Sequence, residues 1–222
     1  MHAATKSKLH FAISKMRITL MHKSKKMKSK SIVIIAILAV IVILGGCACK
    51  GYNGIVKEDE NVKKVWANVQ TEYQNRADLV PNLVNTVKGA ANFEQKTLTD
   101  VINARAKATS VNIDAENLTP EKLAEFQAAQ AQLSGSLSRL LVSVEQYPTL
   151  KAGENFTKLQ NQLEGIENNI KNSRRTFNEA VQSYNLQVRT FPMNIFAGMF
   201  GFKQKPPFQS DPGSEKAPEV KF

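Results

Sequence analysis

Histidine and cysteine, which carry much of protein catalysis and metal binding, are confined to one end of this chain. The three histidines, His2, His10 and His22, all precede residue 32, and the two cysteines are Cys47 and Cys49. The long remainder therefore cannot assemble a Ser-His-Asp or Cys-His site. It also cannot supply the Glu-x-x-His pairs by which helical bundles hold two metal ions. We expect no enzyme of these classes and no bound cofactor.

Carboxylates remain as the other source of chemistry, since they can bind hard cations or act as acid and base. The four that we considered are spread at helical surface spacing without a dense cluster: Glu94, Glu145, Glu164 and Glu167. We expect solvated helix faces, and a carboxylate-based metal-binding or hydrolytic protein is the alternative function.

Six other polar residues stand next to predicted apolar stripes. Arg76, Asp78 and Asn82 flank Pro81, and a second group, with two asparagines two helical turns apart, consists of Arg174, Asn178 and Asn185. Polar groups beside a buried seam need partners, because an unsatisfied one costs roughly 1–3 kcal/mol. They form either a polar network between helices or a groove that binds a partner protein.

The segment MKSKSIVIIAILAVIVILGGC, which ends at Cys47, is basic, then apolar, then small. This order is typical of a secretory signal peptide. The Leu-Gly-Gly-Cys end looks like a bacterial lipobox, in which the thiol of Cys47 is acylated and the chain is cut before it. The thirteen apolar residues 32–44 are shorter than the roughly 20 of a usual transmembrane helix. An uncleaved transmembrane anchor that extends through Ala48 is the alternative to a lipoprotein.

Positive charge is concentrated in the leader. Residues 1–46 hold nine Lys/Arg and no acidic residue, whereas residues 47–222 hold 21 basic and 19 acidic ones. The nearly neutral remainder argues against nucleic-acid binding. The basic side of an apolar segment stays in the cytoplasm. We therefore expect residues 47–222 to lie outside the cytoplasm, attached to a membrane. We expect the true start at Met27.

Helical periodicity dominates the rest of the chain. Apolar residues recur every three or four positions from Val62 to Ala104, again after Thr119-Pro120, and a third time from about Glu154 until Pro192. Thr119 suits an N-cap and Pro120 a first helical position. We predict an all-α fold: an elongated antiparallel, coiled-coil-like bundle of three long amphipathic helices behind an N-terminal hydrophobic helix. The first is kinked or broken near Pro81, which gives three or four segments.

The predicted organisation has four parts. Residues 1–46 are the leader, 47–57 a membrane-proximal linker, 58–192 the bundle, and 193–222 an aromatic cap with a flexible tail. The aromatic side chains of the last part either bind a partner or the membrane, or fold back on the bundle: Phe196, Phe200, Phe202 and Phe208.

Several segments resemble the LemA family of bacterial envelope proteins. They include RADLVPNLVNTVKG (76–89), EQYPTLKAGENFTKLQNQLEGIENNI (145–170), FNEAVQSYNLQVRTFP (177–192) and GFKQKPPF (201–208). The resemblance implies one N-terminal hydrophobic segment and a helical bundle, with no assigned enzymatic activity or cofactor. Phe93 stands where the family usually has histidine and Phe177 where it usually has tyrosine. These departures argue against a catalytic role shared across the family for either position.

These features together predict a membrane-tethered, extracytoplasmic, non-catalytic adaptor or scaffold in the bacterial cell envelope. Its predicted partners are the membrane and an unidentified envelope protein, and the helices are also suited to self-association.

Overall fold

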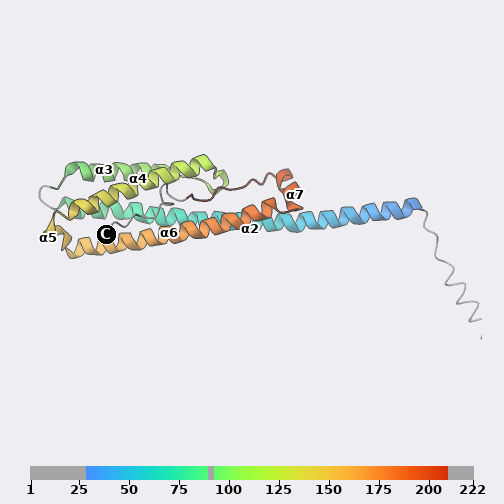
Figure 1. Ribbon diagram of the computed structural model, residues 1–222, viewed down its shortest axis with the longest axis horizontal. Coiled ribbons are helices and arrows are strands. Elements are labelled where there is room, and N and C mark those ends of the chain that lie inside the picture. The colour runs from blue at the N-terminus through green and yellow to red at the C-terminus, as the bar shows by residue number, and fades with distance from the viewer. Residues whose placement is uncertain (1–28, 90–92, 210–222) are drawn as a thin grey trace, which may run out of the picture. The chain divides into compact units, whose positions relative to one another are not determined.

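A computed structural model of the chain describes residues 29–89 and 93–209, and every regular element in these ranges is helical (Figure 1). The elements are α2 (Ser29–Lys88), α3 (Gln95–Ser110), a 3₁₀ turn η1 (Ala115–Asn117), α4 (Pro120–Val144), α5 (Pro148–Lys151), α6 (Glu154–Arg189) and α7 (Met193–Met199). The all-α prediction is confirmed. The chain divides into two compact units, residues 1–47 and 48–222, and α2 contributes to both.

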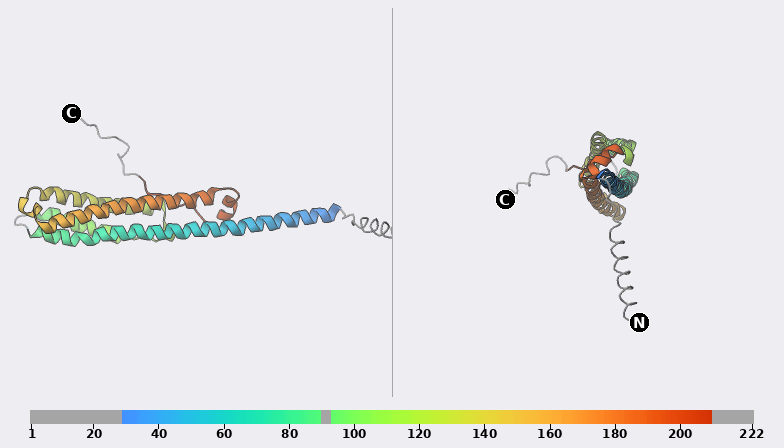
Figure 2. Two further views of the ribbon diagram at one scale, coloured as in Figure 1. Left: turned by 90° about the horizontal axis from the view of Figure 1, so that it is seen from below. Right: turned by 90° about the vertical axis from the view of Figure 1, so that its right-hand side faces the viewer.

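The second unit is a bundle of four long helical stretches. The part of α2 in this unit lies beside α6, and the α3–α4 pair completes the bundle (Figure 2). Short connections at α5 and near residue 89 reverse the chain direction at one end, and α7 lies at the other end. Short connections of this kind produce antiparallel neighbours.

The predicted apolar stripes form the core of this unit. One buried cluster is aromatic and gathers around Trp66, Phe126 and Phe177, while the second is aliphatic and gathers around Leu83, Leu133 and other residues of α2, α3, α4 and α6. The rings of Trp66 lie 5.4 Å from Phe126 and 5.3 Å from Phe177. Such close ring pairs add to the stabilisation that burial of apolar surface provides.

The interruption of the first predicted helix lies at residues 89–94, because α2 continues through Pro81 to Lys88. Proline cannot donate a backbone hydrogen bond, which leaves the carbonyl of Ala77, four residues earlier, without its helical partner. Arg105 of α3 replaces that partner, since its Nε donates to the Ala77 carbonyl at 2.7 Å. The helix therefore does not end at Pro81, and the chain turns only after Lys88.

The predicted start of the second long helix is confirmed. Thr119 is the N-cap of α4, its hydroxyl accepts from the Lys122 N–H at 3.3 Å, and Pro120 occupies the first turn. The loop before it is fixed by Trp66, whose indole Nε1 donates to the Ile113 carbonyl at 2.9 Å. Burial of the largest side chain thus also orders the connection between α3 and α4.

Both ends of the predicted bundle continue into ordered structure. Residues 47–57 are helical within α2, and Ile55 is fully buried. After α6, the short helix α7 is followed by an extended segment, residues 202–209, in which Phe208 is buried. The part of the predicted flexible tail beyond residue 209 lies outside the described residues.

Candidate functional site

Two asparagines of α6 hold the extended segment 202–209 against the bundle. Asn178 Nδ2 donates to the Phe208 carbonyl at 3.1 Å, and its Oδ1 accepts from the Phe208 N–H at 2.8 Å. Asn185 makes the same pair of bonds with Lys205, at 2.8 and 2.9 Å. Each amide therefore pairs with both backbone groups of one residue, as a neighbouring strand would.

The spacing of these contacts fits both the rise of the helix α6 and the rise of an extended chain. Seven residues of helix between the asparagines advance about 10 Å, and three residues of extended or polyproline chain cover about the same distance. The intervening Pro206 and Pro207 favour that extended form and have no N–H that would need a partner. Because residue numbers fall along α6 as they rise along the segment, the two run antiparallel.

Arg174 and Tyr184 extend this attachment. Arg174 donates to the Gln209 carbonyl at 3.0 Å and its guanidinium lies 4.9 Å from the centre of the Phe208 ring. The Tyr184 hydroxyl donates to the Lys203 carbonyl at 2.9 Å. The second predicted polar group, Arg174, Asn178 and Asn185, is thus brought together, and it binds a segment of the same chain.

A nearly buried ion pair fastens the same segment to α2. Lys205 Nζ lies 2.9 Å from Asp59 Oδ1, with side-chain exposures of 11% and 16%, and it donates to the Ala115 carbonyl at 3.2 Å. Burial, and secondarily the negative charge of Asp59, raises the pKa of Tyr184 to about 12. The segment is therefore held by groups from α2, the η1 turn and α6.

Arg76 belongs to a separate network inside the bundle. Its Nη1 donates to Glu167 at 2.9 Å, and its Nη2 donates to the side chain and carbonyl of Gln130, at 2.7 and 3.1 Å. Gln130 in turn donates to the Ala108 carbonyl at 3.2 Å. This network connects α2, α3, α4 and α6, and a set of such directional bonds fixes one register among several sterically possible ones.

Asp78 and Asn82 are not part of that network, and both are exposed on α2. Gln74 donates to Asp78 at 2.8 Å, and Arg105 lies at 4.0 Å from the same carboxylate. Both residues line a shallow, open groove of about 520 Å³ between α2 and α6, together with Gln162 and Asn169. The first predicted polar group is therefore divided between the interior and an open polar groove.

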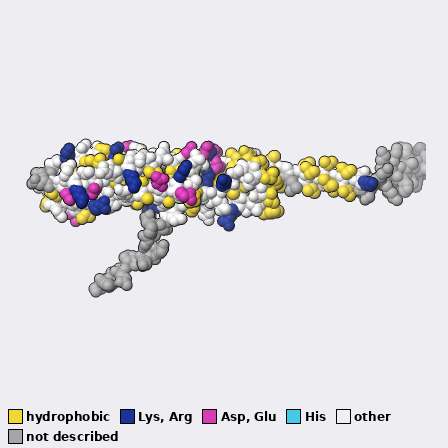
Figure 3. All heavy atoms as spheres, turned by 90° about the horizontal axis from the view of Figure 1, so that it is seen from above, with side chains coloured by type: hydrophobic (Ala, Val, Ile, Leu, Met, Phe, Trp, Pro, Cys, Tyr) yellow, Lys and Arg dark blue, Asp and Glu magenta, His cyan; other side chains and the backbone are white. Residues whose placement is uncertain are grey.

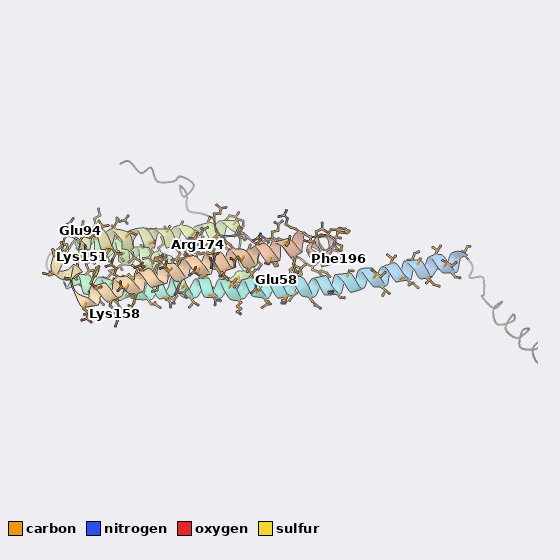
Figure 4. All side chains as sticks on the ribbon, turned by 60° about the horizontal axis from the view of Figure 1, so that its bottom comes forward. Glu58, Glu94, Lys151, Lys158, Arg174 and Phe196 are labelled. Carbon is orange, nitrogen blue, oxygen red and sulfur yellow. The ribbon has the colours of Figure 1, made fainter. Side chains whose placement is uncertain are left out.

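The four candidate carboxylates do not form a common site, because each has different surroundings. Glu94 accepts from Thr97 at 2.9 Å, Glu145 pairs with Lys151 at 3.5 Å, Glu164 is exposed and Glu167 binds Arg76. Figure 4 shows Glu94 and Lys151 at the bundle end opposite to Phe196. Within residues 29–89 and 93–209, no group of three or more His, Cys, Asp or Glu side chains is arranged to hold a metal ion.

Cys47 and Cys49 are exposed free cysteines. They follow the apolar segment, whose large side chains from Ile32 to Ile43 are between 51% and 73% exposed. Among the described helices, only α2 contains a stretch long and apolar enough to cross a membrane, although a signal sequence has the same properties. The lipoprotein and the uncleaved anchor thus both fit this segment.

Sequence reasoning missed the partners of the predicted polar residues. Gln130 could not be predicted as a partner of Arg76 because glutamine is common on exposed helix faces. Glu167 was predicted to lie on a solvated face. Lys205 and Asp59 lie far apart in the sequence, and no helical or strand spacing connects them. The Lys-Gln-Lys-Pro-Pro-Phe run was a usable signal, because a fixed extended conformation invites binding in a groove.

The family follows from comparison of the whole sequence. Residues 65–222, more than half of the chain, match the model of the LemA family. The chain belongs to the LemA family. Its Phe177 is completely buried between Trp66 and Phe208, with ring centres 5.3 Å from each. The position at which the family usually has a tyrosine is therefore a core position here.

Three relatives illustrate the range of the similarity. Magnetosome protein MamQ 2 of Paramagnetospirillum magneticum is 24% identical over 202 residues, which cover 83% of this chain and 74% of the relative. Magnetosome protein MamQ of Magnetospirillum gryphiswaldense is 25% identical over 181 residues, 74% of this chain and 66% of the relative. Protein LemA of Metamycoplasma hominis is 24% identical over 145 residues, 65% of this chain and 63% of the relative.

Proposed function

We propose that this LemA-family protein is a membrane-tethered adaptor or scaffold of the bacterial envelope. The observation that carries the proposal is the apolar segment of α2, in which every large side chain from Ile32 to Ile43 is at least half exposed. A continuous apolar surface of this kind is unfavourable in water and favourable in the hydrocarbon of a bilayer.

Charge supports an orientation for the tethered bundle. The segment before the apolar residues carries nine Lys/Arg and no acidic residue, whereas residues 47–222 are nearly neutral. The positive-inside rule keeps the basic side in the cytoplasm. The bundle then works outside the cytoplasm, whether Cys47 carries lipid or the helix remains uncut.

The proposed partner-binding face is the polar groove between α2 and α6. Arg76, Asn178 and Asn185 are engaged within the chain. The exposed polar side chains that line the groove are those of Asn75, Asp78, Asn82, Gln162 and Asn169. Exposed amides and carboxylates can recognise a partner through hydrogen bonds, which confer specificity more than affinity.

Site-specific crosslinking in intact envelopes tests this function. A photoreactive amino acid at Asn82 is expected to trap a defined partner, while the same amino acid at Glu125, on the exposed face of α4, is not. A leader-only chain, residues 1–57, serves as the background control. If Asn82 captures nothing above both controls, the adaptor function at this face is refuted.

A further inference from the structure

The α7 end of the second unit carries an exposed apolar surface, the basal patch, formed by Tyr52, Ile195, Met199 and Phe200. Their exposures are 40%, 56%, 76% and 50%. Figure 3 shows hydrophobic side chains gathered over this end of the unit, and Figure 4 places Phe196 there. Single exposed apolar residues are ordinary, whereas a cluster of large ones marks a binding surface.

The patch is built by close packing of α7 on α2. The Tyr52 ring lies 5.0 Å from the Phe200 ring and 5.7 Å from the Phe202 ring. A Cβ at Gly51 would overlap the Met193 side chain, so a larger residue there would require that side chain to move. Ile195 and Met199 are four residues apart and therefore lie on one face of α7. The exposed side chains therefore lie beside partly buried neighbours, Met193 and Phe202.

The chain segments that form the patch carry only basic charges, while the acidic side chains of Asp59 and Glu116 share a surface hollow with Phe202 and Lys203. Residues 45–57 and 180–209, which include α7 and its neighbours, contain no acidic residue and five basic ones: Lys50, Lys57, Arg189, Lys203 and Lys205. The rest of residues 47–222 holds 16 basic and 19 acidic residues, so the small net charge hides an uneven distribution. Lys205 is bound by Asp59, and the other four are exposed.

We propose that the basal patch docks on the surface of an anionic lipid bilayer, with Ile195, Met199 and Phe200 inserted at the boundary between headgroups and acyl chains. Aromatic and aliphatic side chains flanked by Lys and Arg are the composition that binds this interface. Anionic headgroups attract the exposed basic residues within a Debye length. The bundle is then attached to the membrane at two points, the N-terminal apolar segment and the basal patch.

The tether length brings the patch within reach of the membrane. Tyr52 follows Leu44, the last residue of the apolar segment, by eight residues. Even a fully extended chain of eight residues spans at most about 28 Å. The inference rests on the proposed membrane location and is independent of the adaptor role.

Tryptophan quenching in vesicles tests the docking. The full chain is reconstituted into vesicles that contain phosphatidylglycerol, prepared with either ordinary or brominated acyl chains. Trp66, the single tryptophan, is 1% exposed and gives an unquenched background. Met199→Trp adds a reporter in the patch. Val142→Trp is the matched control, since Val142 is 66% exposed near the opposite end of the bundle.

Bromine is expected to lower the emission that Met199→Trp adds by about twofold or more, because an interfacial side chain lies within roughly 5–10 Å of the acyl chains. The emission from Val142→Trp should not change. Ile195→Glu, added to Met199→Trp, should restore the emission, and vesicles of phosphatidylcholine alone should weaken the quenching. Equal quenching in both lipids would refute the role of the basic residues.

Flotation of the chain with the vesicles separates two kinds of failure. A chain that does not float contradicts the proposed membrane location itself. A chain that floats while Met199→Trp stays unquenched refutes only the docking. Emission that shifts to shorter wavelength without quenching, and more so at higher protein density, would show that a second copy covers the patch and would also refute the proposal.

Discussion

The side chains that matter most in this protein bind backbone rather than other side chains. Asn178 and Asn185 each bond to one backbone N–H and one backbone carbonyl of the extended segment. The segment is therefore bound through its backbone. Their seven-residue separation predicted a shared face of α6 but could not show what covers it. Periodicity identifies a face within one helix, whereas a contact between distant segments depends on how the chain folds back.

Asn178→Leu keeps the shape of the side chain and removes both bonds to Phe208. We expect the attachment of residues 202–209 to weaken by about 1–3 kcal/mol, which corresponds to at least a roughly fivefold rise in local opening. Hydrogen exchange of the Phe208 amide should accelerate by that factor, while core amides of α6 stay protected. Asn172→Leu, on the exposed face of α6, is the control. An unchanged Phe208 amide would contradict this role.

Tyr184 should make stability depend on pH under alkaline conditions. Its pKa is raised from 10.0 to about 12, so the folded state favours the protonated phenol. This contribution is complete below pH 10 and disappears between pH 10 and 12, by up to about 1.4 kcal/mol per pH unit.

The comparison of wild type with Tyr184→Phe isolates that effect. Lys63 also loses stabilising interactions at high pH, because hydrogen bonds to Glu60 and Glu116 raise its pKa. Urea unfolding at several alkaline pH values should show a steeper loss of stability for the wild type than for Tyr184→Phe. Parallel curves would show that the Tyr184 phenol titrates as an ordinary exposed one.

At the scale of elements, Pro81 shows why helix boundaries are hard to predict. Proline usually interrupts a helix because a carbonyl loses its donor, and no local pattern indicates that Arg105 supplies another donor. The amphipathic stripes and the Thr119 cap, which depend on local spacing, were predictable. The end of α2 at Lys88 was not, because the apolar period continues from α2 into α3.

A double-mutant cycle tests this compensation. Arg105→Met leaves the carbonyl of the buried Ala77 without a donor and should destabilise the protein by about 1–3 kcal/mol. In a Pro81→Ala background the N–H at residue 81 can bond to Ala77 again, so the same substitution should cost less than about 0.5 kcal/mol. Chemical denaturation measures both. Equal costs in the two backgrounds would exclude compensation, and Arg175→Met, an exposed arginine of α6, is the control.

At the scale of the whole molecule, two compact units share one helix, α2. The second unit has its own core, whereas none of the side chains described at residues 30–43 and 45–47 is buried. The sequence shows two different patterns in these parts, an uninterrupted apolar segment and an amphipathic stripe. It could not predict that Phe200 would lie against Tyr52, which joins distant parts of the chain in one exposed apolar surface.

The junction between the units is also where processing is expected. Gly45 and Gly46 are helical here, but glycine is about 1 kcal/mol less favourable than alanine in a helix, so this point unwinds readily. An unwound Leu-Gly-Gly-Cys stretch is what a peptidase that cuts before Cys47 requires.

We therefore expect the protein from native envelopes to begin at Cys47 and to carry acyl chains, as intact mass spectrometry would show. Cys47→Ser should leave an uncut chain without added mass, whereas Cys49→Ser should be processed normally. A wild-type mass equal to that of the uncut chain would instead establish α2 as an uncleaved anchor.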